Sequence, residues 1–292
     1  MRTSRFDLGR ERSIAWAIVA SVFAGVLSQG QALAASNRTQ PAPRGIVVRA
    51  SYIEGIDVSH WQGTIDWTRV AGSGKKFAFA KATEGQTYND PTYSTNRAGA
   101  EGRGMSFGAY HFARPDTTQN DAVLEADHFA AVAAYRPGEI RPSLDLEDSG
   151  GLSVSTLNTW VKAFLNELYK KTGKRAMIYT NPSFWQTYMG DTTWFANNGY
   201  TLLWIANWGV SKPSVPANNW GGHGWTFWQW TSCESVPGIS GCVDGDRTLR
   251  PYTLEHTSMA LSPAASERQR LGEHGHQHRW PPAGWLTSPP AA

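Results

Sequence analysis

The segment Arg141-Pro142-Ser143-Leu144-Asp145-Leu146-Glu147 is a short apolar run that ends in two carboxylates. Residues two apart on a strand share a face, so the spacing predicts that Leu144 and Leu146 pack outward while Asp145 and Glu147 point inward. A rise of roughly 3.3 Å per residue would separate the two acids by about 6.5 Å. At that separation one acid can donate a proton while its ionised neighbour stabilises developing positive charge. The alternative is a pair of solvated acids at a strand end.

Strand-like runs alternate with helical patterns along the rest of the chain, which is typical of a parallel sheet with crossover helices. The expected strands cover residues 54–59, 77–83, 106–112, 141–147, 175–181 and 201–207, followed by 225–230 and 243–249. Helices are expected over 119–135 and over 154–171, where Ser153 can cap the start and Gly173 follows the end. Beyond residue 207 too little chain separates the strands for full crossover helices. The sequence therefore predicts a closed, irregular α/β barrel of about five β/α units followed by three strands.

The two ends of the chain differ from its middle in composition. Arginines up to Arg12 precede an apolar run over 14–27, and Ala32-Leu33-Ala34 fits a small-x-small cleavage pattern, so residues 1–34 are expected to be a signal peptide. A membrane anchor is the alternative, but the run has fewer than about 18 consecutive apolar residues. We expect a secreted, extracellular protein with no stable membrane association after cleavage. Residues 35–52 are expected to be a flexible lead, 53–250 the barrel, and 251–292 a disordered tail whose His-rich piece at 273–278 could instead bind a metal.

Charge and cysteine usage exclude some classes of function. The whole chain carries +3, yet residues 53–250 hold 17 Lys and Arg against 19 Asp and Glu, a net charge of −2, so no nucleic-acid footprint is present. Cys233 and Cys242 enclose eight residues, and in an oxidising compartment they are expected to form a disulfide that closes a hairpin-like loop. A metal site is the alternative, but no His or Cys ligand lies nearby in sequence. The 14 tryptophans could fill a barrel core or present flat rings to sugars.

Polar and aromatic residues gather at the expected carboxyl ends of the strands, where parallel β/α barrels carry their working groups. The acids are Asp57, Asp145, Glu147 and Asp244, and the flanking residues are Glu84, Tyr110, Tyr179, Trp204, Asn207 and Gln229. Such a cleft suits a neutral substrate rich in hydroxyl groups. Several members have a structural alternative: a helix cap for Asp57, an ion pair with Lys81 for Glu84, a place in the core for both tyrosines, and bonds to turn amides for Asp244.

Five ordered motifs resemble those of family 25 glycoside hydrolases, the Chalaropsis-type lysozymes, over roughly residues 53–250. The motifs are Gly55–Gln62, Lys-Ala-Thr-Glu-Gly at 81–85, Gly108–Phe112, Asp-x-Glu at 145–147, and Val243-Asp244. The resemblance implies an irregular (β/α)5(β)3 TIM-like barrel that forms a single catalytic domain. It also implies a β-1,4-N-acetylmuramidase that acts on peptidoglycan glycan strands between N-acetylmuramic acid and N-acetylglucosamine. We expect no cofactor, no metal and a monomer.

The same resemblance implies roles for individual residues. Glu147 matches the catalytic acid, Asp145 its electrostatic partner, and Asp57 and Asp244 the further acids of the site. Tyr110 matches a tyrosine that contacts substrate, and we expect Tyr179, Trp204, Asn207, Gln229 and Glu84 to bind substrate as well. Asp246 departs from the pattern, because relatives commonly carry Asn there, and this difference affects a local contact or its charge.

Several chemical alternatives stay open at this point. Attack by the N-acetyl carbonyl of the substrate would give retention, whereas a water held by Asp57 or Asp244 would give inversion. A chitinase-like or other N-acetylhexosaminidase also places Asp-x-Glu on a fourth strand, although the earlier acids of such a series are missing here. A catalytically inactive glycan-binding barrel would have no need of a buried acid pair, whose desolvation is costly. A zinc-dependent wall amidase would need a His pair at ligand spacing, and none lies at the strand ends.

Overall fold

The computed structural model describes residues 52–249, so the expected signal peptide and tail, and the expected lead apart from Tyr52, lie outside the described residues. Its strands are β1 (Tyr52–Val58), β2 (Phe77–Glu84), β3 (Tyr88–Asn89), β4 (Ser106–Phe112), β5 (Ser143–Asp145), β6 (Met177–Thr180), β7 (Leu203–Ala206), β8 (Phe227–Glu234) and β9 (Val243–Leu249). Its helices are a 3-10 turn at His60–Gln62, α1 (Trp67–Gly72), α2 (Tyr93–Glu101), α3 (Asp121–Ala133), α4 (Val154–Thr172), α5 (Pro182–Tyr188), α6 (Trp194–Asn197) and α7 (Pro216–Gly221).

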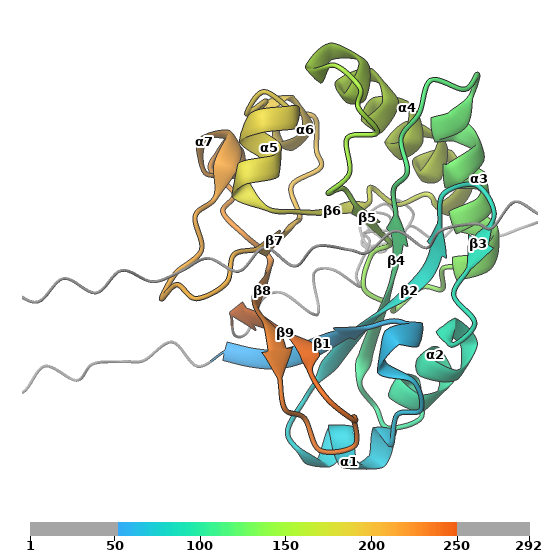
Figure 1. Cartoon of the computed structure of the whole chain (residues 1–292), viewed down its shortest axis with the longest axis vertical. Coiled ribbons are helices and arrows are strands. Elements are labelled where there is room, and N and C mark those ends of the chain that lie inside the picture. Colours follow the sequence, from blue (N-terminus) through green and yellow to red (C-terminus); the bar gives the residue numbers. More distant parts are fainter. Residues whose placement is uncertain (1–51, 250–292) are drawn as a thin grey trace, which may run out of the picture. The chain divides into compact units, whose positions relative to one another are not determined.

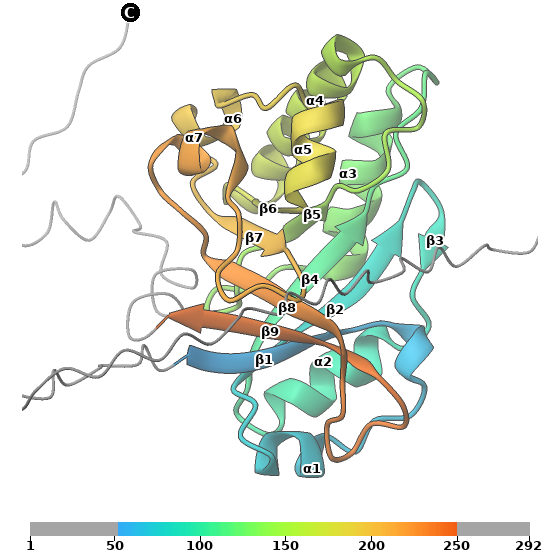
Figure 2. The same cartoon turned by 60° about the vertical axis from the view of Figure 1, so that its left-hand side comes forward.

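Eight of the strands close into a barrel. The sheet order is β1-β9-β8-β7-β6-β5-β4-β2, and β1 pairs with β2 to complete the ring, while the short β3 extends the edge of β2. Within the ring, neighbours from β1 through β8 are parallel and β9 is antiparallel to both β8 and β1, while β3 outside the ring is antiparallel to β2. Figures 1 and 2 show β1, β9 and β8 side by side, with the helices outside the strands. The predicted closed α/β barrel is confirmed.

The crossovers become shorter toward the end of the chain. Helices α1 to α6 lie in the connections up to β7, α7 between β7 and β8 is a single turn with left-handed backbone at residues 217–220, and β8 returns to β9 without a helix. In α4 the Ser153 hydroxyl accepts from the Thr156 amide, Gly173 ends the helix in a left-handed conformation, and the apolar stripe is buried as predicted.

Two apolar layers lie on opposite faces of the strands. The outer layer contains Leu144 and Leu146 and packs against helices such as α3 and α4. The inner layer fills the barrel with aromatic side chains, among them Phe79, Trp204 and Phe227, and the rings of Phe79 and Trp204 stack with centroids 4.2 Å apart. The strand alternation therefore places the leucines outside, as the segment at 141–147 predicts.

The observed strands differ from the predicted ones mainly at their ends. β5 spans three residues rather than the seven expected, because Pro142 has no amide hydrogen for the ladder and pairing ends soon after Asp145. The Leu146 amide still donates to the Tyr179 carbonyl at 2.9 Å, so Glu147 leaves the sheet directly after a residue that is bonded to β6. Helix α3 is shorter than the expected 119–135, and β1 begins at Tyr52, one residue before the expected start of the barrel.

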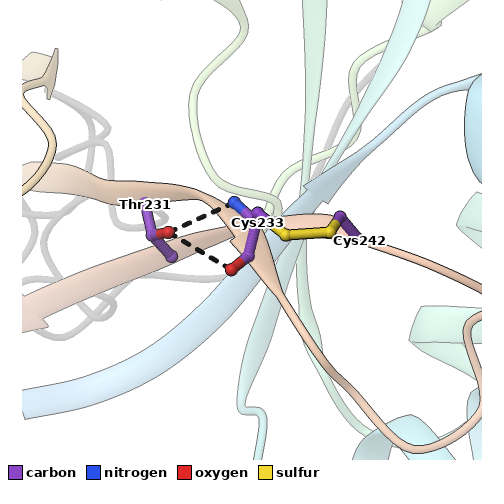
Figure 3. Close-up of a disulfide and its surroundings, with 3 residues drawn as sticks. All are labelled: Thr231, Cys233 and Cys242. Atoms are coloured by element: carbon purple, nitrogen blue, oxygen red, sulfur yellow. Dashed lines mark hydrogen bonds between the residues drawn. A yellow bond between two sulfur atoms is a disulfide. The ribbon is translucent and has the colours of Figure 1, made fainter. Parts of the chain in front are cut away.

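Cys233 and Cys242 form the predicted disulfide, with their Cα atoms 4.5 Å apart. Figure 3 shows the bond linking the end of β8 to the residue before β9, with the Thr231 hydroxyl beside Cys233. The Cys233 amide donates to Thr231 Oγ1 at 3.1 Å. The bond therefore restrains the hairpin that leads into Asp244.

None of the helices within residues 52–249 has both the length and the apolar character needed to span a membrane.

Candidate active site

A pocket of about 270 Å³ opens at the carboxyl edge of the parallel strands. Eight of the predicted site residues line it: Asp57, Tyr110, Asp145, Glu147, Tyr179, Trp204, Gln229 and Asp244. Asn207 lines a neighbouring pocket instead, and Glu84 lines neither. These eight residues come from seven strands and the position two residues after β5, and Lys81 on β2 also lines the pocket.

The barrel topology explains why the four acids meet. Asp57 lies near the carboxyl end of β1, and Asp145 ends β5. Because β9 runs in the opposite direction, its first residues lie at the same edge, and the sheet register sets Asp244 directly opposite Asp57. Like charges in such a cross-strand pair are unfavourable, which favours protonation of one of them.

Asp145 and Glu147 form the central acid pair. Burial is the main cause that raises the pKa of both carboxyl groups above their ordinary values, and for Asp145 the charge of Glu147 adds to it. Glu147 reaches the open side of the pocket, whereas Asp145 is buried and its Oδ1 has no hydrogen-bond partner among residues 52–249. This oxygen is an acceptor available to a ligand. The raised pKa lets the pair keep a proton to higher pH than exposed carboxyl groups would, as a general acid requires.

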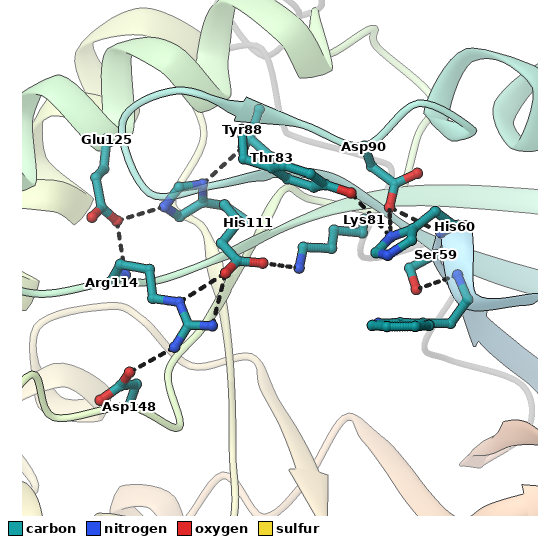
Figure 4. Close-up of polar contacts among 12 residues, drawn as sticks. Ser59, His60, Lys81, Thr83, Tyr88, Asp90, His111, Arg114, Glu125 and Asp148 are labelled. Carbon is teal, nitrogen blue, oxygen red and sulfur yellow. Dashed lines mark hydrogen bonds and ion pairs between the residues drawn. The ribbon is translucent and has the colours of Figure 1, made fainter. Parts of the chain in front are cut away.

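Lys81 provides the positive charge of the pocket and counteracts this shift. Its charge lowers the pKa of both Asp145 and Glu147, and it forms an ion pair with Glu84. Arg114 bridges Glu84, at 2.7 Å, and Asp148, at 2.8 Å; Figure 4 shows Lys81, Arg114 and Asp148 in this arrangement. Glu84 therefore forms the ion pair with Lys81 that was the structural alternative to substrate binding. It lies beside the pocket and does not line it.

The remaining acids lie at the bottom of the pocket, in a group of residues that we call the floor: Asp57, Trp204, Gln229, Asp244 and Asp246. Gln229 Nε2 donates to Asp57 Oδ2 at 2.8 Å, and Trp204 Nε1 donates to Asp246 Oδ1 at 2.8 Å. Burial, followed by the charge of Asp246, raises the pKa of Asp57 well above its ordinary value. Burial also raises the pKa of Asp244 and that of Asp246 to about 8. The floor therefore keeps protons that exposed carboxyl groups would lose.

The site extends beyond the four acids into an elongated groove. A second pocket of about 440 Å³ shares Glu147, Tyr179 and Trp208 with the first and continues to Asn181 and Asn207. Trp208 is 52% exposed at this junction, and Trp61, which also lines the first pocket, is 82% exposed. A groove with exposed flat rings at separate points suits a chain of sugar rings on both sides of a bond held at Glu147.

Sequence reasoning did not assign seven of the residues that line the first pocket, among them Lys81, Trp61 and Trp208. Lys81 was noted only as a partner for Glu84, although its place in the motif at 81–85 could have indicated it. Trp61 lies three residues after β1 and Trp208 two residues after β7, and this position close to a strand end was the available signal. Among the described residues, no group of three or more His, Cys, Asp or Glu side chains could hold a metal ion.

Comparisons with known proteins agree with this geometry. A family model described as "Glycosyl hydrolases family 25" matches residues 56–239. Lysozyme M1 of Streptomyces globisporus is 40% identical over 206 residues, which cover 68% of this chain and 68% of that protein. An N,O-diacetylmuramidase of Arthroderma benhamiae is 36% identical over 223 residues, 73% of this chain and 91% of that protein. The crystal structure of the bacterial lysozyme from Streptomyces coelicolor matches with a TM-score of 0.64 and 36% identity, covering 72% of this chain and 99% of that one.

Proposed function

The chain belongs to glycosyl hydrolase family 25, and from that premise we propose that it is a lysozyme that cleaves the β-1,4 bond between N-acetylmuramic acid and N-acetylglucosamine in peptidoglycan. The observation that carries the proposal is the position of Asp145 and Glu147, which line one pocket together with Asp57 and Asp244. The groove past Glu147 supports a polymeric substrate, since it gives room for sugar rings on both sides of the bond that is cut.

In the proposed reaction Glu147 is the general acid. It gives its proton to the glycosidic oxygen as the bond from that oxygen to the anomeric carbon breaks. The carbonyl oxygen of the substrate's own N-acetyl group attacks the anomeric carbon from the opposite face. Glu147, now a carboxylate, then takes a proton from water, the water oxygen bonds to the anomeric carbon, and the acetamido group is restored. Two displacements give overall retention of configuration.

Asp145 has the role of orienting the acetamido group. Its Oδ1 is buried and has no partner among residues 52–249, so it can accept the acetamido N–H. A hydrogen bond to the charged form favours that form. Substrate binding would therefore favour the carboxylate on Asp145 and leave the shared proton on Glu147, the residue that faces the open side of the pocket.

The experiment that tests the function is the identification of the new reducing sugar. Purified peptidoglycan digested with the protein and then reduced with borohydride should yield the reduced form of N-acetylmuramic acid. Reduced N-acetylglucosamine would instead support a glucosaminidase or a chitinase-like enzyme, and binding to glycan without any new reducing end would support an inactive glycan-binding barrel. NMR of the anomeric protons during cleavage of soluble fragments should show retention; inversion would move the catalytic water to Asp57 or Asp244.

We also propose that the protein is exported. The support is the Arg-rich start followed by an apolar run and a small-x-small pattern, together with the disulfide between Cys233 and Cys242. Mass spectrometry of the protein recovered from culture medium should give a chain that begins at Ala35. An intact N-terminus in a cell-associated protein would contradict export with cleavage.

A further inference from the structure

A chain of hydrogen bonds with a fixed direction crosses the floor of the pocket. The Tyr179 hydroxyl and Trp208 Nε1 both donate to Gln229 Oε1, at 3.0 and 2.9 Å. An indole N–H can only donate, so the amide oxygen of Gln229 must face these two groups. The Gln229 amide nitrogen then faces Asp57 and donates to its Oδ2 at 2.8 Å. Asp57 Oδ2 therefore accepts a hydrogen bond from an amide group whose orientation is fixed.

The opposite end of the floor has the same kind of fixed donor. Trp204 Nε1 donates to Asp246 Oδ1 at 2.8 Å, and the Asp246 side chain is fully buried. Asp246 Oδ2 is also buried and has no donor among residues 52–249. The sheet register sets Asp246 opposite Gln229, the residue that donates to Asp57, and the carboxyl groups of Asp57 and Asp246 are within reach of each other for a shared hydrogen bond. Two carboxylates contain only acceptors, so this contact needs a proton that neither neighbour supplies.

We propose that Asp57 and Asp246 hold one proton between them, and that Asp246 is the positioning residue that fixes the Asp57 carboxyl group in the floor of the site. One proton completes the donor count, since Asp57 Oδ2 and Asp246 Oδ1 each already accept an N–H and Asp246 Oδ2 has no donor among residues 52–249. Without it, two negative charges would face each other in a buried site, which is strongly unfavourable. The pairing is argued from the structure of the pocket, whereas its effect on catalysis rests on the proposed lysozyme function.

The surrounding charges favour retention of that proton. The titratable groups that interact with the pair come from several elements: Asp244 on β9, Asp145 and Glu147 at β5, Tyr110 on β4, Tyr179 on β6 and Lys75 before β2. The cation Lys75 acts on Asp246 and lowers its pKa, but Lys75 is itself paired with Glu54 and Glu234. Burial raises the pKa of Asp57 well above its ordinary value and that of Asp246 to about 8, so the pair keeps a proton at neutral pH.

The variant Asp246→Asn removes the acidic proton of residue 246 and keeps the shape of its side chain. An Asn oxygen can accept from Trp204 Nε1, and its amide nitrogen can donate to Asp57, so every hydrogen bond of the floor is kept. The hydrogen bond between residue 246 and Asp57, which we call the bridge, needs no shared proton in the variant and therefore no longer depends on pH. Asp246→Leu, whose side chain has the same number of heavy atoms and the same branching, removes the bridge at every pH and serves as the matched variant.

The decisive measurement is the midpoint of thermal unfolding between pH 5 and pH 9 for the wild type, Asp246→Asn and Asp246→Leu. A folded-state pKa above the unfolded value means that the native pair binds the extra proton, so wild-type stability falls as pH rises toward and through about 8. The midpoint of Asp246→Asn minus that of the wild type should therefore increase with pH. Asp244, with a pKa of about 8, is present in all three proteins but interacts with the pair, so the sign of the difference and not its size reports on residue 246. Asp246→Leu should unfold at a lower temperature than Asp246→Asn throughout.

Parallel pH dependences for the wild type and Asp246→Asn would overturn the proposal. Failure of Asp246→Asn to fold would overturn it as well, because the amide can make every required hydrogen bond. As a second readout, the alkaline limb of kcat/KM on soluble glycan fragments should move to higher pH in Asp246→Asn, whereas a merely structural role would leave its position unchanged. The stability measurement needs no substrate, so a protein inactive on peptidoglycan with the expected midpoints would contradict the proposed function and leave the acid pair intact.

Discussion

Removal of the disulfide tests how strongly the β8–β9 hairpin is held next to the site. Cys233 and Cys242 are nine positions apart, so the bond closes a short loop. The chain-entropy relation for a loop of about nine residues gives about 2.6 kcal/mol of stabilisation at 25 °C. The double variant Cys233→Ser/Cys242→Ser should lose about that free energy of unfolding. For a domain of about 200 residues the loss corresponds to a decrease in Tm of about 5 to 10 °C.

Urea unfolding followed by tryptophan fluorescence measures this loss directly. Oxidised wild type should be more stable than the double variant by the stated amount, while wild type in reductant should match the double variant, which itself should not respond to reductant. At 25 °C the double variant should still cleave glycan, because backbone pairing of β9 with β1 and β8 also positions Asp244. A midpoint that stays the same on both reduction and substitution would refute the reasoning. A loss above about 5 kcal/mol would show that more than loop entropy is involved.

Three further predictions concern the pocket and the domain limits. Lys81→Met should move both limbs of the pH–activity profile to higher pH by on the order of 1 unit, because the Lys81 charge lowers the pKa of Asp145 and Glu147; limbs at unchanged pH would contradict this. Trp61→Ala should raise KM on polymeric glycan and leave Tm unchanged, since the ring is 82% exposed; an unchanged KM in steady-state kinetics would remove Trp61 from the binding surface. A chain ending at Tyr252 should match the full mature chain on soluble fragments, with any difference confined to intact walls below neutral pH, where tail histidines gain charge. Loss of activity on soluble fragments would place part of the barrel after that residue.

The part of the fold that follows from alternation along single strands could be predicted from the sequence. Leu144 packs outside the barrel and Asp145 lines the pocket because adjacent side chains on a strand point to opposite faces. The limits of α4 were predictable as well, since Ser153 and Gly173 are local signals that act within one helical turn. The convergence of Asp57 and Asp244 needed one more step, the closure of the barrel by a reversed last strand.

Contacts between distant segments could not be read from local patterns. Gln229 lies 172 positions from Asp57, and only the barrel closure brings them together. A buried chain from Thr83 through His111 to Glu125 was also missed; its two contacts are both 2.8 Å and are visible in Figure 4. An acid such as Glu125 on a helix is expected to face solvent, and only the packing of α3 on the barrel buries it. Burial raises the pKa of Glu125 to about 8 and lowers that of His111 well below its ordinary value.

The most direct test of the account is the initial rate at which Glu147→Gln releases reducing ends from purified peptidoglycan. An amide cannot donate the proton, so the rate should fall by about 10²- to 10⁴-fold or more while Tm stays near that of the wild type. Asp148→Asn is the matched control, because it removes the neighbouring carboxylate charge from a residue that does not line the pocket and should retain most of the activity. A near-normal rate for Glu147→Gln would contradict the assignment of Glu147 as the general acid.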